Sequence, residues 1–199
     1  MIVACDRTGV KLAVSIIKNG GLVVFPTDTV YGLGCDPHNS KAVKNIFRIK
    51  KRIESKELPL LGFSKNEISK IAIFDESSNK LADRFWPGAL TLVLKIKNKS
   101  MKKTMNLGEK VAVRVPNHPC TLSLLKECRV LVGTSANFSG SPSFSDSKKV
   151  LENFSGFDIL IDMGTIENSG ESTIVEMDDG NLKILRQGKI AESELIAAL

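Results

Sequence analysis

The chain has 199 residues, of which 42% are hydrophobic and 25% are charged. This composition is typical of a folded domain and excludes wholesale disorder, and no apolar run approaches the ~20 residues that span a bilayer. The formal net charge of +6 favours anionic partners such as nucleotides, phosphate or nucleic acid without choosing among them.

The first half of the chain alternates helical and extended patterns. Apolar spacing predicts a helix over 10–19 and then a buried strand over 22–25. A second helix over 40–51, with Asn39 or Ser40 as its cap, precedes a strand over 58–63. A helix around 81–85 ends at Pro87-Gly88, and a run of β-formers predicts a strand over 90–96.

In the second half we predict strands over 111–115, 130–133 and 157–161, and short helices around 122–125, after Asp146 and over 195–197. Asp179-Gly180 predicts the turn of a hairpin between 173–176 and 182–185. The basic segment 97–110 is predicted to be a mobile loop. We expect an α/β fold, with a twisted open mixed sheet and helices on its faces.

The cysteines are scattered without any C-x-x-C pair, at Cys5, Cys35, Cys120 and Cys128. We expect free thiols in a cytoplasmic protein and no metal site built from cysteine and histidine. The N-terminus lacks the long apolar core of a signal peptide, so none is predicted.

Two polar clusters directly follow predicted buried strands, where open α/β sheets bind ligands. The segment 26–34 contains Thr27, Thr29 and the only tyrosine, Tyr31, and the segment 134–143 is rich in small hydroxyl residues. Such residues can hold phosphate, but neither a P-loop nor a dinucleotide-binding glycine pattern is present. Taken alone, each cluster is as consistent with an ordinary polar loop as with a binding site.

Three further residues have chemistry that needs a partner. Lys50 and Arg52 turn toward a common ligand if their helix ends near Lys50; the alternative is a solvated helix end. Arg114 lies in an apolar strand, where it requires either a structural salt bridge or a substrate carboxylate or phosphate. His118 is predicted to form a local hydrogen bond rather than act as a general base.

Seven strings follow one another along the chain: Pro26-Thr27-Asp28-Thr29-Val30-Tyr31-Gly32-Leu33-Gly34, Lys50-Lys51-Arg52, Phe85-Trp86-Pro87-Gly88-Ala89-Leu90-Thr91-Leu92-Val93-Leu94, Val113-Arg114-Val115-Pro116 with His118, Ser135-Ala136-Asn137, Glu171-Ser172-Thr173-Ile174, and Arg186-Gln187-Gly188. Together they resemble the YrdC-like family of threonylcarbamoyl-AMP synthases. The resemblance covers essentially the whole chain, and the first and third strings are highly specific.

The resemblance implies a twisted open sheet around a basic cavity. It implies a nucleotidyltransferase that makes threonylcarbamoyl-AMP and pyrophosphate from L-threonine, bicarbonate and ATP. Downstream machinery then uses the product for threonylcarbamoyladenosine modification of tRNA. Mg²⁺ is expected to arrive with ATP, and no tightly bound cofactor is expected. No residue is nominated as a general base.

Site roles follow from the matched positions. Lys50 and Arg52 are the expected catalytic residues, facing the ATP phosphates from an exposed helix end. The implied nucleotide site adds Lys56, Ser135, Asn137, Ser143 and Arg186. The implied threonine site consists of Thr27, Arg114 and Ser172, with Arg114 taking the carboxylate.

The sequence departs from the family pattern at two prolines. Ile53 stands where many members have proline, which makes Lys56 the weaker phosphate candidate. Ala89 also replaces a usual proline, in a packing turn. The chain stops soon after Arg186, so we expect residues 1–199 to be one YrdC-like domain, the single-domain form of the family.

Three other functions are considered. One is a double-stranded RNA or tRNA-binding module of the same family without synthase activity; weak RNA binding is expected in either case, and membrane binding is not. Another is a carbamoyl-phosphate enzyme such as the hydrogenase-maturation carbamoyltransferases, whose additional regions the chain has no room for. The third is a paralogue of unsettled function, which would tend to lose the Lys-x-Arg and Ser-Ala-Asn strings.

Overall fold

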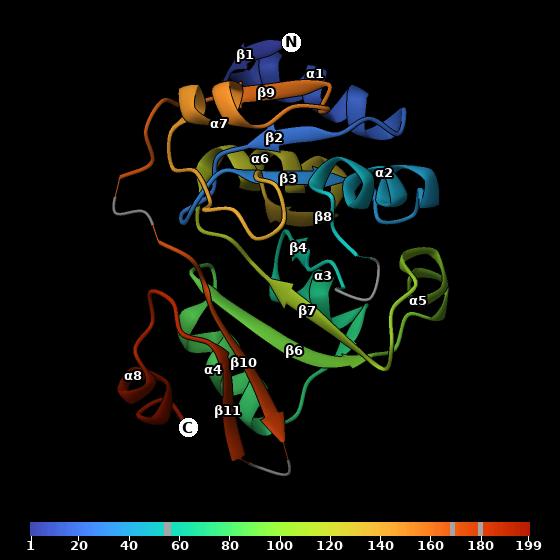
Figure 1. Cartoon of the computed structure of the whole chain (residues 1–199). Helices are drawn as coiled ribbons and strands as arrows, with labels where there is room; N and C mark the ends of the chain where they lie inside the picture. Colours follow the sequence, from blue (N-terminus) through green and yellow to red (C-terminus); the bar gives the residue numbers. More distant parts are fainter. Residues whose placement is uncertain (54–56, 168–169, 179–180) are drawn as a thin grey trace.

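The computed structural model describes residues 1–53, 57–167, 170–178 and 181–199 (Figure 1). Lys56 and the predicted turn at Asp179-Gly180 lie outside these residues. The strands are β1 (Ile2–Ala4), β2 (Val23–Phe25), β3 (Gly32–Cys35), β4 (Leu60–Gly62), β5 (Ala72–Ile73), β6 (Leu90–Ile96), β7 (Lys110–Arg114), β8 (Val130–Ser135), β9 (Ile159–Asp162), β10 (Thr173–Asp178) and β11 (Asn181–Arg186). The helices are α1 (Arg7–Lys18), α2 (Ser40–Lys50), α3 (Lys65–Ser69), α4 (Glu76–Phe85), α5 (Lys99–Met105), α6 (Pro119–Cys128), α7 (Ser147–Asn153) and α8 (Glu192–Ile196).

These strands join in one open sheet, in the order β1-β9-β2-β3-β8-β4-β7-β6-β10-β11, with β5 paired to β6. The pairs β1–β9, β9–β2, β4–β7 and β6–β10 are parallel. The pairs β2–β3, β3–β8, β8–β4, β7–β6 and β10–β11 are antiparallel. The sheet is therefore mixed, and the predicted α/β fold class is confirmed.

Strand β2 is buried on both of its faces. Successive side chains of a strand point to opposite sides, and Val23 and Phe25 pack with α1 and α6 in one core cluster. Val24 belongs to the other cluster, which includes residues of α2, α4, α5 and α7. Helices thus cover both faces of the sheet, which explains why this strand is an uninterrupted apolar run in the sequence.

No helix within the described residues is long and apolar enough to cross a membrane.

The predicted mobile loop over 97–110 is wrong, because this segment contains helix α5. Asn98 caps α5 by accepting a hydrogen bond from the backbone N–H of Met101, 3.0 Å away. Met101 and Met105, four residues apart, are both buried in the core cluster that includes α2. The lysines of this segment hid a short apolar face from sequence reasoning.

Strand β3 was also missed, since it lies inside the string expected to form a polar turn. Gly32 and Gly34 on this strand pack against the ring of Phe25. A Cβ atom at Gly34 would overlap the carbonyl oxygen of Val132 on neighbouring β8. Glycine at this position therefore permits close backbone approach between the two strands.

The expectation of four free thiols is wrong for two of the cysteines. Cys5 and Cys120 form a disulfide with a Cα–Cα distance of 5.9 Å across a sequence separation of 115 residues. Cys35 and Cys128 are free. Sequence spacing could not reveal the pair, because Cys5 and Cys120 meet only after α6 packs beside α1.

Candidate functional site

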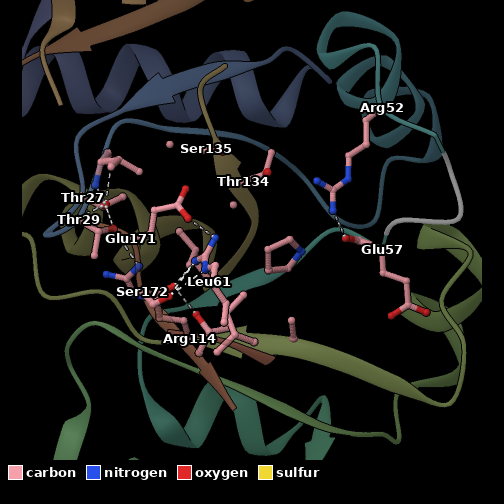
Figure 2. Close-up of a pocket in the computed structure, with 18 residues that line it drawn as sticks. Thr27, Thr29, Arg52, Glu57, Leu61, Arg114, Thr134, Ser135, Glu171 and Ser172 are labelled. Atoms are coloured by element: carbon pink, nitrogen blue, oxygen red, sulfur yellow. Dashed lines mark hydrogen bonds and ion pairs between the residues drawn. The ribbon is translucent and has the colours of Figure 1, made fainter. Parts of the chain in front are cut away.

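A cavity of about 230 Å³ is built from the loop after β2, the end of α2 and strands of the middle and outer sheet (Figure 2). Its described lining residues are Thr27, Thr29, Val30, Gly32, Arg52, Glu57, Pro59, Leu61, Thr91, Ala112, Arg114, Gly133, Thr134, Ser135, Glu171, Ser172, Ile174 and Arg186. Among these residues, arginine supplies three positive charges and glutamate two negative ones. The lining therefore combines hydroxyls with a surplus of cations, which suits an anionic ligand.

The loop between β2 and β3 is organised by one hydroxyl. Thr27 Oγ1 lies 2.6 Å from the carbonyl oxygen of Val30, to which it donates. It also accepts from the N–H groups of Thr29, at 3.1 Å, and Val30, at 3.2 Å. These bonds from a side chain to its own turn fix the loop, so that Thr27 and Thr29 both face the cavity.

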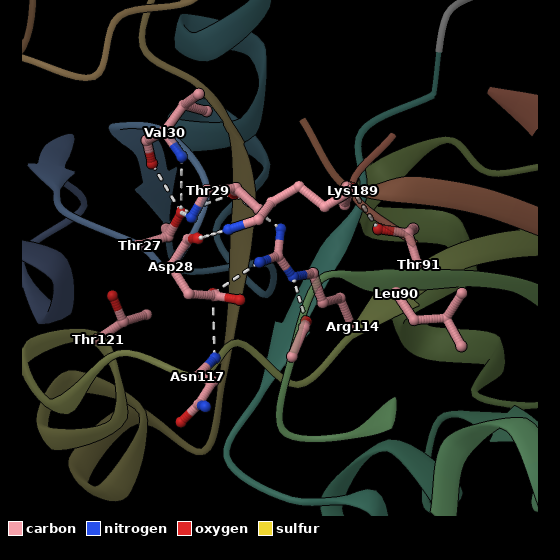
Figure 3. A network of polar contacts seen from close by, with 12 residues as sticks. Thr27, Asp28, Thr29, Val30, Leu90, Thr91, Arg114, Asn117, Thr121 and Lys189 are labelled. Atoms are coloured by element: carbon pink, nitrogen blue, oxygen red, sulfur yellow. Dashed lines mark hydrogen bonds and ion pairs between the residues drawn. The ribbon is translucent and has the colours of Figure 1, made fainter. Parts of the chain in front are cut away.

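Arg114 ends β7 and is only 6% exposed (Figure 3). Its Nη2 donates to Asp28 Oδ1 at 2.6 Å, its Nη1 to Thr29 Oγ1 at 3.0 Å and its Nε to the carbonyl oxygen of Gly88 at 2.8 Å. Asp28 also accepts from the N–H of Asn117 at 3.0 Å. Burial lowers the pKa of Arg114, and the charge of Asp28 opposes that shift.

These bonds use three of the five N–H groups that a guanidinium carries. Counting the partners among the described residues, one N–H on each terminal nitrogen of Arg114 is left over, and the residue lines the cavity. A pair of N–H groups on adjacent nitrogens matches the two oxygens of a carboxylate. Arg114 needs a partner because it lies in an apolar strand, and it has one in its salt bridge to Asp28. The guanidinium still has N–H groups available for a ligand.

Arg186 at the end of β11 is bound to Ser172, just before β10. Its Nε and Nη2 donate to the Ser172 carbonyl oxygen at 3.1 and 2.9 Å, and Nη2 also reaches Ser172 Oγ at 3.0 Å. The Ser172 hydroxyl lies 2.9 Å from Thr91 Oγ1 on β6. A Cβ atom at Gly188 would overlap the Glu171 carbonyl oxygen, so glycine there allows the two segments to meet.

Glu171 occupies the same wall of the cavity. Its Oε2 lies 2.8 Å from Arg186 Nη1, and its Oε1 accepts from Ser143 Oγ at 3.2 Å. The Glu171 side chain is 42% exposed and that of Arg186 is 39% exposed, so the pair is open to exchange with a ligand. Ser143 thereby reaches the cavity wall through Glu171.

Lys50 is the last residue of α2 and is 1% exposed. Its Nζ donates to the carbonyl oxygens of Ser135, at 2.5 Å, and Asn137, at 2.8 Å, and to Asn137 Oδ1 at 3.1 Å. All three ammonium N–H groups therefore have acceptors. Burial and, to a smaller extent, the charge of Arg52 lower the pKa of Lys50 to about 7.

Arg52 takes a different direction from Lys50. Helix α2 ends at Lys50, and Lys51 follows in the left-handed conformation with φ 50°. Arg52 then lines the cavity, and its Nη2 donates to the Glu57 carbonyl oxygen at 2.9 Å. The predicted helix end is confirmed, but the expected exposure of Lys50 is wrong, because one oxygen at the end of β8 and two oxygens of Asn137 surround its ammonium group.

The cavity gathers most of the predicted site residues: Thr27, Arg52, Arg114, Ser135, Ser172 and Arg186. Lys50 and Asn137 are bonded to each other and to Ser135, and Ser143 contacts Glu171. Lys56 lies outside the described residues. His118 makes the predicted local bond, since its Nδ1 accepts from the N–H of Cys120 at 3.2 Å as the cap of α6.

Five polar residues of the described lining have no individual role in the sequence-based assignment: Thr29, Glu57, Thr91, Thr134 and Glu171. Thr29 belongs to the first matched string and Glu171 is adjacent to Ser172, so both were visible as neighbours of nominated residues. Thr91 lies in an apolar strand pattern. Glu57 lies in the loop that follows Ile53, where the sequence departs from the family pattern. Only the tertiary structure brings Thr91 to Ser172 and Glu57 to Arg52.

In the described part of the chain, no three His, Cys, Asp or Glu side chains gather as ligands for a metal ion. Glu57 and Glu171 are the carboxylates among the described lining residues. Mg²⁺ prefers oxygen ligands and commonly shares them with substrate phosphates. The lining therefore fits a Mg²⁺ that arrives bound to a phosphorylated substrate.

The sheet and its lining define an α/β protein with an arginine-lined cavity. The family model described as "Telomere recombination" (Sua5, YciO, YrdC) matches residues 15–188. The chain therefore belongs to the Sua5/YciO/YrdC family, which confirms the resemblance found in the sequence.

Two relatives and one solved structure are similar to most of the chain. A Pyrococcus abyssi protein named threonylcarbamoyl-AMP synthase is 36% identical over 190 residues, covering 94% of this chain and 56% of that protein. A Methanocaldococcus jannaschii relative is 35% identical over 185 residues, covering 90% of this chain and 85% of that protein. The crystal structure of P. abyssi Sua5 complexed with L-threonine has a TM-score of 0.92 at 32% identity, covering 100% of this chain and 61% of that one.

The chain spans only about half the length of the first curated relatives that it matches, 56% of one and 55% of another.

Proposed function

We propose that the chain is a threonylcarbamoyl-AMP synthase, a nucleotidyltransferase that uses L-threonine, bicarbonate and ATP to form L-threonylcarbamoyladenylate and pyrophosphate. The product would enter threonylcarbamoyladenosine modification of tRNA through separate transfer machinery. The observation that carries the proposal is Arg114, a buried guanidinium with two uncommitted N–H groups in a cavity with two further arginines. The names of the relatives and the threonine complex of P. abyssi Sua5 support it.

Threonine is proposed to bind with its carboxylate on Arg114. The loop hydroxyl of Thr27 and the hydroxyl of Ser172 belong to residues that line the same cavity as this guanidinium. Ser172 is linked to Thr91 and to Arg186, so its hydroxyl has a fixed position from which it can meet a substrate hydroxyl. A site of this kind favours substrates that carry both a carboxylate and a hydroxyl.

ATP is proposed to lie between Arg52 and Arg186, which line opposite walls of the cavity, and to contact Ser135. Arg52 and Lys50 would stabilise charge on the phosphates, with Ser135, Asn137, Ser143, Arg186 and Lys56 as the remaining proposed contacts. Lys50 could bind a phosphate oxygen only in exchange for one of its present acceptors. It also holds the Ser135–Asn137 segment that would contact the nucleotide.

The reaction needs alignment more than a nucleophilic side chain. The threonine nitrogen forms a bond to the bicarbonate carbon, water leaves, and a carbamate results. A carbamate oxygen then attacks the α-phosphorus of ATP while the bond to the β-phosphate oxygen breaks and pyrophosphate departs. Mg²⁺ bound with ATP would neutralise phosphate charge. Preorganised arginine N–H groups would stabilise the charge that develops at the α-phosphate of the transferred adenylyl group and on the departing pyrophosphate.

The domain organisation, cellular location and RNA binding of the chain belong to the same proposal. One sheet that includes β1 and β11 supports residues 1–199 as one domain. A cytoplasmic location and weak RNA binding remain predictions. An RNA-binding module without synthase activity is the alternative, and it gives no role to the spare N–H groups of Arg114 inside a cavity of about 230 Å³.

The test is pyrophosphate release by the purified chain supplied with ATP, Mg²⁺ and bicarbonate, with each amino acid in turn. The proposal predicts release that requires both threonine and bicarbonate. Equal release without threonine, or none from a folded protein, would contradict it.

A further inference from the structure

The two carboxylates of the described cavity lining, Glu57 and Glu171, have different hydrogen-bond partners. Glu57 Oε1 already accepts from the backbone N–H of Gly108 at 2.6 Å. Glu171 lies across the cavity from Glu57, beside Ser172 (Figure 2). Its carboxylate oxygens are bonded to Arg186 Nη1 and Ser143 Oγ. Glu171 is therefore the carboxylate adjoining the residue proposed to bind threonine.

The backbone around Glu171 is anchored to the loop between β2 and β3, residues 26–31, which contains Thr27 and Thr29 and is proposed as the threonine loop. The N–H of Gly170 donates to the Thr29 carbonyl oxygen at 3.3 Å, and the N–H of Lys189 donates to the Glu171 carbonyl oxygen at 3.0 Å. Gly188 packs directly on the same carbonyl group. Glu171 is thus fixed near Thr29, whose hydroxyl accepts from Arg114. The carboxylate and the guanidinium face one cavity at a separation set by the folded backbone.

An amino acid brings both charges into such a cavity. If Arg114 binds the carboxylate of threonine, the ammonium group needs an anion or acceptor, because an unpaired charge in a confined site is costly. The chemistry adds a second requirement. Threonine ammonium and bicarbonate give the carbamate, one water and one proton, so a proton must leave the nitrogen for each turnover.

We propose that Glu171 binds the amino group of threonine and accepts the proton that this nitrogen loses as the N–C bond forms. The inference rests on the proposed function. In the absence of substrate, Arg186 and Ser143 hold the Glu171 carboxylate. When a nucleotide phosphate takes Arg186, the carboxylate is released from that ion pair and turns to the amine. Nucleotide binding at Arg186 would thereby free Glu171 to accept the proton from the threonine nitrogen.

The test compares Glu171→Gln with the wild-type chain, and uses Glu152→Gln on the surface of α7 as the matched control for loss of a carboxylate. Pyrophosphate release is measured at varied threonine from about pH 7 to about pH 9.5, across the titration of an α-amino group. We expect Glu171→Gln to lower kcat/KM for threonine by ~10–100-fold at pH 7 and to approach wild type as pH rises. A neutral amine needs neither the counter-charge nor the base, which is why the deficit shrinks.

The other charged groups that face Glu171 are the same in the wild-type chain and in Glu171→Gln. Arg52, Arg114 and Arg186 face the cavity from three elements, and arginine stays charged across this range. Lys50 titrates within it, with a pKa of about 7, so the ratio of variant to wild type is the quantity to follow. The neutral Ser143 hydroxyl does not titrate.

A deficit that is the same at every pH, or one confined to the KM for ATP, would overturn the inference and leave Glu171 as a structural partner of Arg186. Glu171→Asp keeps the carboxylate and is expected to retain the wild-type pH dependence with reduced rate, which covers the case in which the glutamine variant does not fold. Absence of threonine-dependent pyrophosphate from the wild type would instead refute the proposed function.

Discussion

Lys50 and Arg114 are both buried cations of the proposed site, yet their surroundings differ. Lys50 has three N–H groups and three protein acceptors. Arg114 has five N–H groups and three bonded protein partners. The comparison teaches that donor count, and not charge alone, decides which buried cation retains capacity for a ligand. Lys50 stabilises the loop after β8, whereas Arg114 is braced by Asp28 and still presents N–H groups to the cavity.

The largest expected effect is that of Lys50→Ala. Its removal takes one donor from each of three oxygens, of which the Ser135 carbonyl oxygen keeps the Asn137 N–H and Asn137 Oδ1 keeps the Ser135 hydroxyl. The free energy of unfolding should therefore fall by about 1–3 kcal/mol. Turnover should fall by ~10²-fold. Arg52→Ala is the matched variant, with a similar loss of turnover and a stability change below about 1 kcal/mol. Urea unfolding and pyrophosphate assays measure both quantities. Equal stability of the two variants would show that Lys50 does not stabilise the fold more than Arg52 does.

Arg114→Ala should depress kcat/KM by ~10²-fold for threonine, serine and valine alike, because all three share the carboxylate that Arg114 is proposed to bind. In the wild type, serine should be ~10–200-fold poorer than threonine, since one methyl group gives limited discrimination. Valine should be poorer still if a buried hydroxyl loses its partner. Steady-state rates for the three amino acids decide the matter. A variant that reorders them would show that Arg114 reads the side chain instead.

The disulfide joins helix α6 to the segment that follows β1. Cys120 lies on α6, next to Thr121, whose hydroxyl donates to the Pro26 carbonyl oxygen at the start of the threonine loop. Because the bridge closes a long loop, its removal in Cys5→Ser should lower the free energy of unfolding by about 2–4 kcal/mol. Thiol titration in denaturant should find two free thiols in the wild type, Cys35 and Cys128. Four thiols would show that the bridge is absent.

The last prediction concerns the pH dependence of stability. The pKa of Lys50 is lowered by burial to about 7, from an ordinary value of 10.5. Between these values the unfolded chain holds a proton that the folded chain lacks, so the free energy of unfolding should rise with pH across this window. The difference between wild type and Lys50→Met isolates this contribution, up to about 1.4 kcal/mol per pH unit. A flat difference would mean that buried Lys50 keeps its charge throughout.

Much of the fold was predictable because its core strands are apolar runs with clear ends. The pattern at β2, with Val23 and Phe25 on one side and Val24 on the other, identifies a doubly covered strand. Helix α5 was hidden because only Met101 and Met105 face the core among many lysines. Strand β3 was hidden because glycine has low strand propensity, and its fit against Phe25 is a tertiary property.

The candidate site was predictable where a residue violated its local pattern. Arg114 in an apolar strand demanded a partner, and the structure supplies Asp28 from a segment 86 residues away. The burial of Lys50 could not be read in the same way, because its acceptors are carbonyl oxygens of the segment near Ser135. Two of its three acceptors are main-chain oxygens, which have no signature in the sequence, so a buried ammonium group and an exposed one look alike there.

The most direct test of the account is identification of the product by mass spectrometry. The wild-type chain is incubated with ATP, Mg²⁺, ¹⁵N-threonine and ¹³C-bicarbonate, and the nucleotide fraction is analysed immediately. The account predicts one adenylate that contains both labels, together with an equal amount of pyrophosphate. An adenylate with the threonine label and no ¹³C, or pyrophosphate without any labelled adenylate, would contradict it.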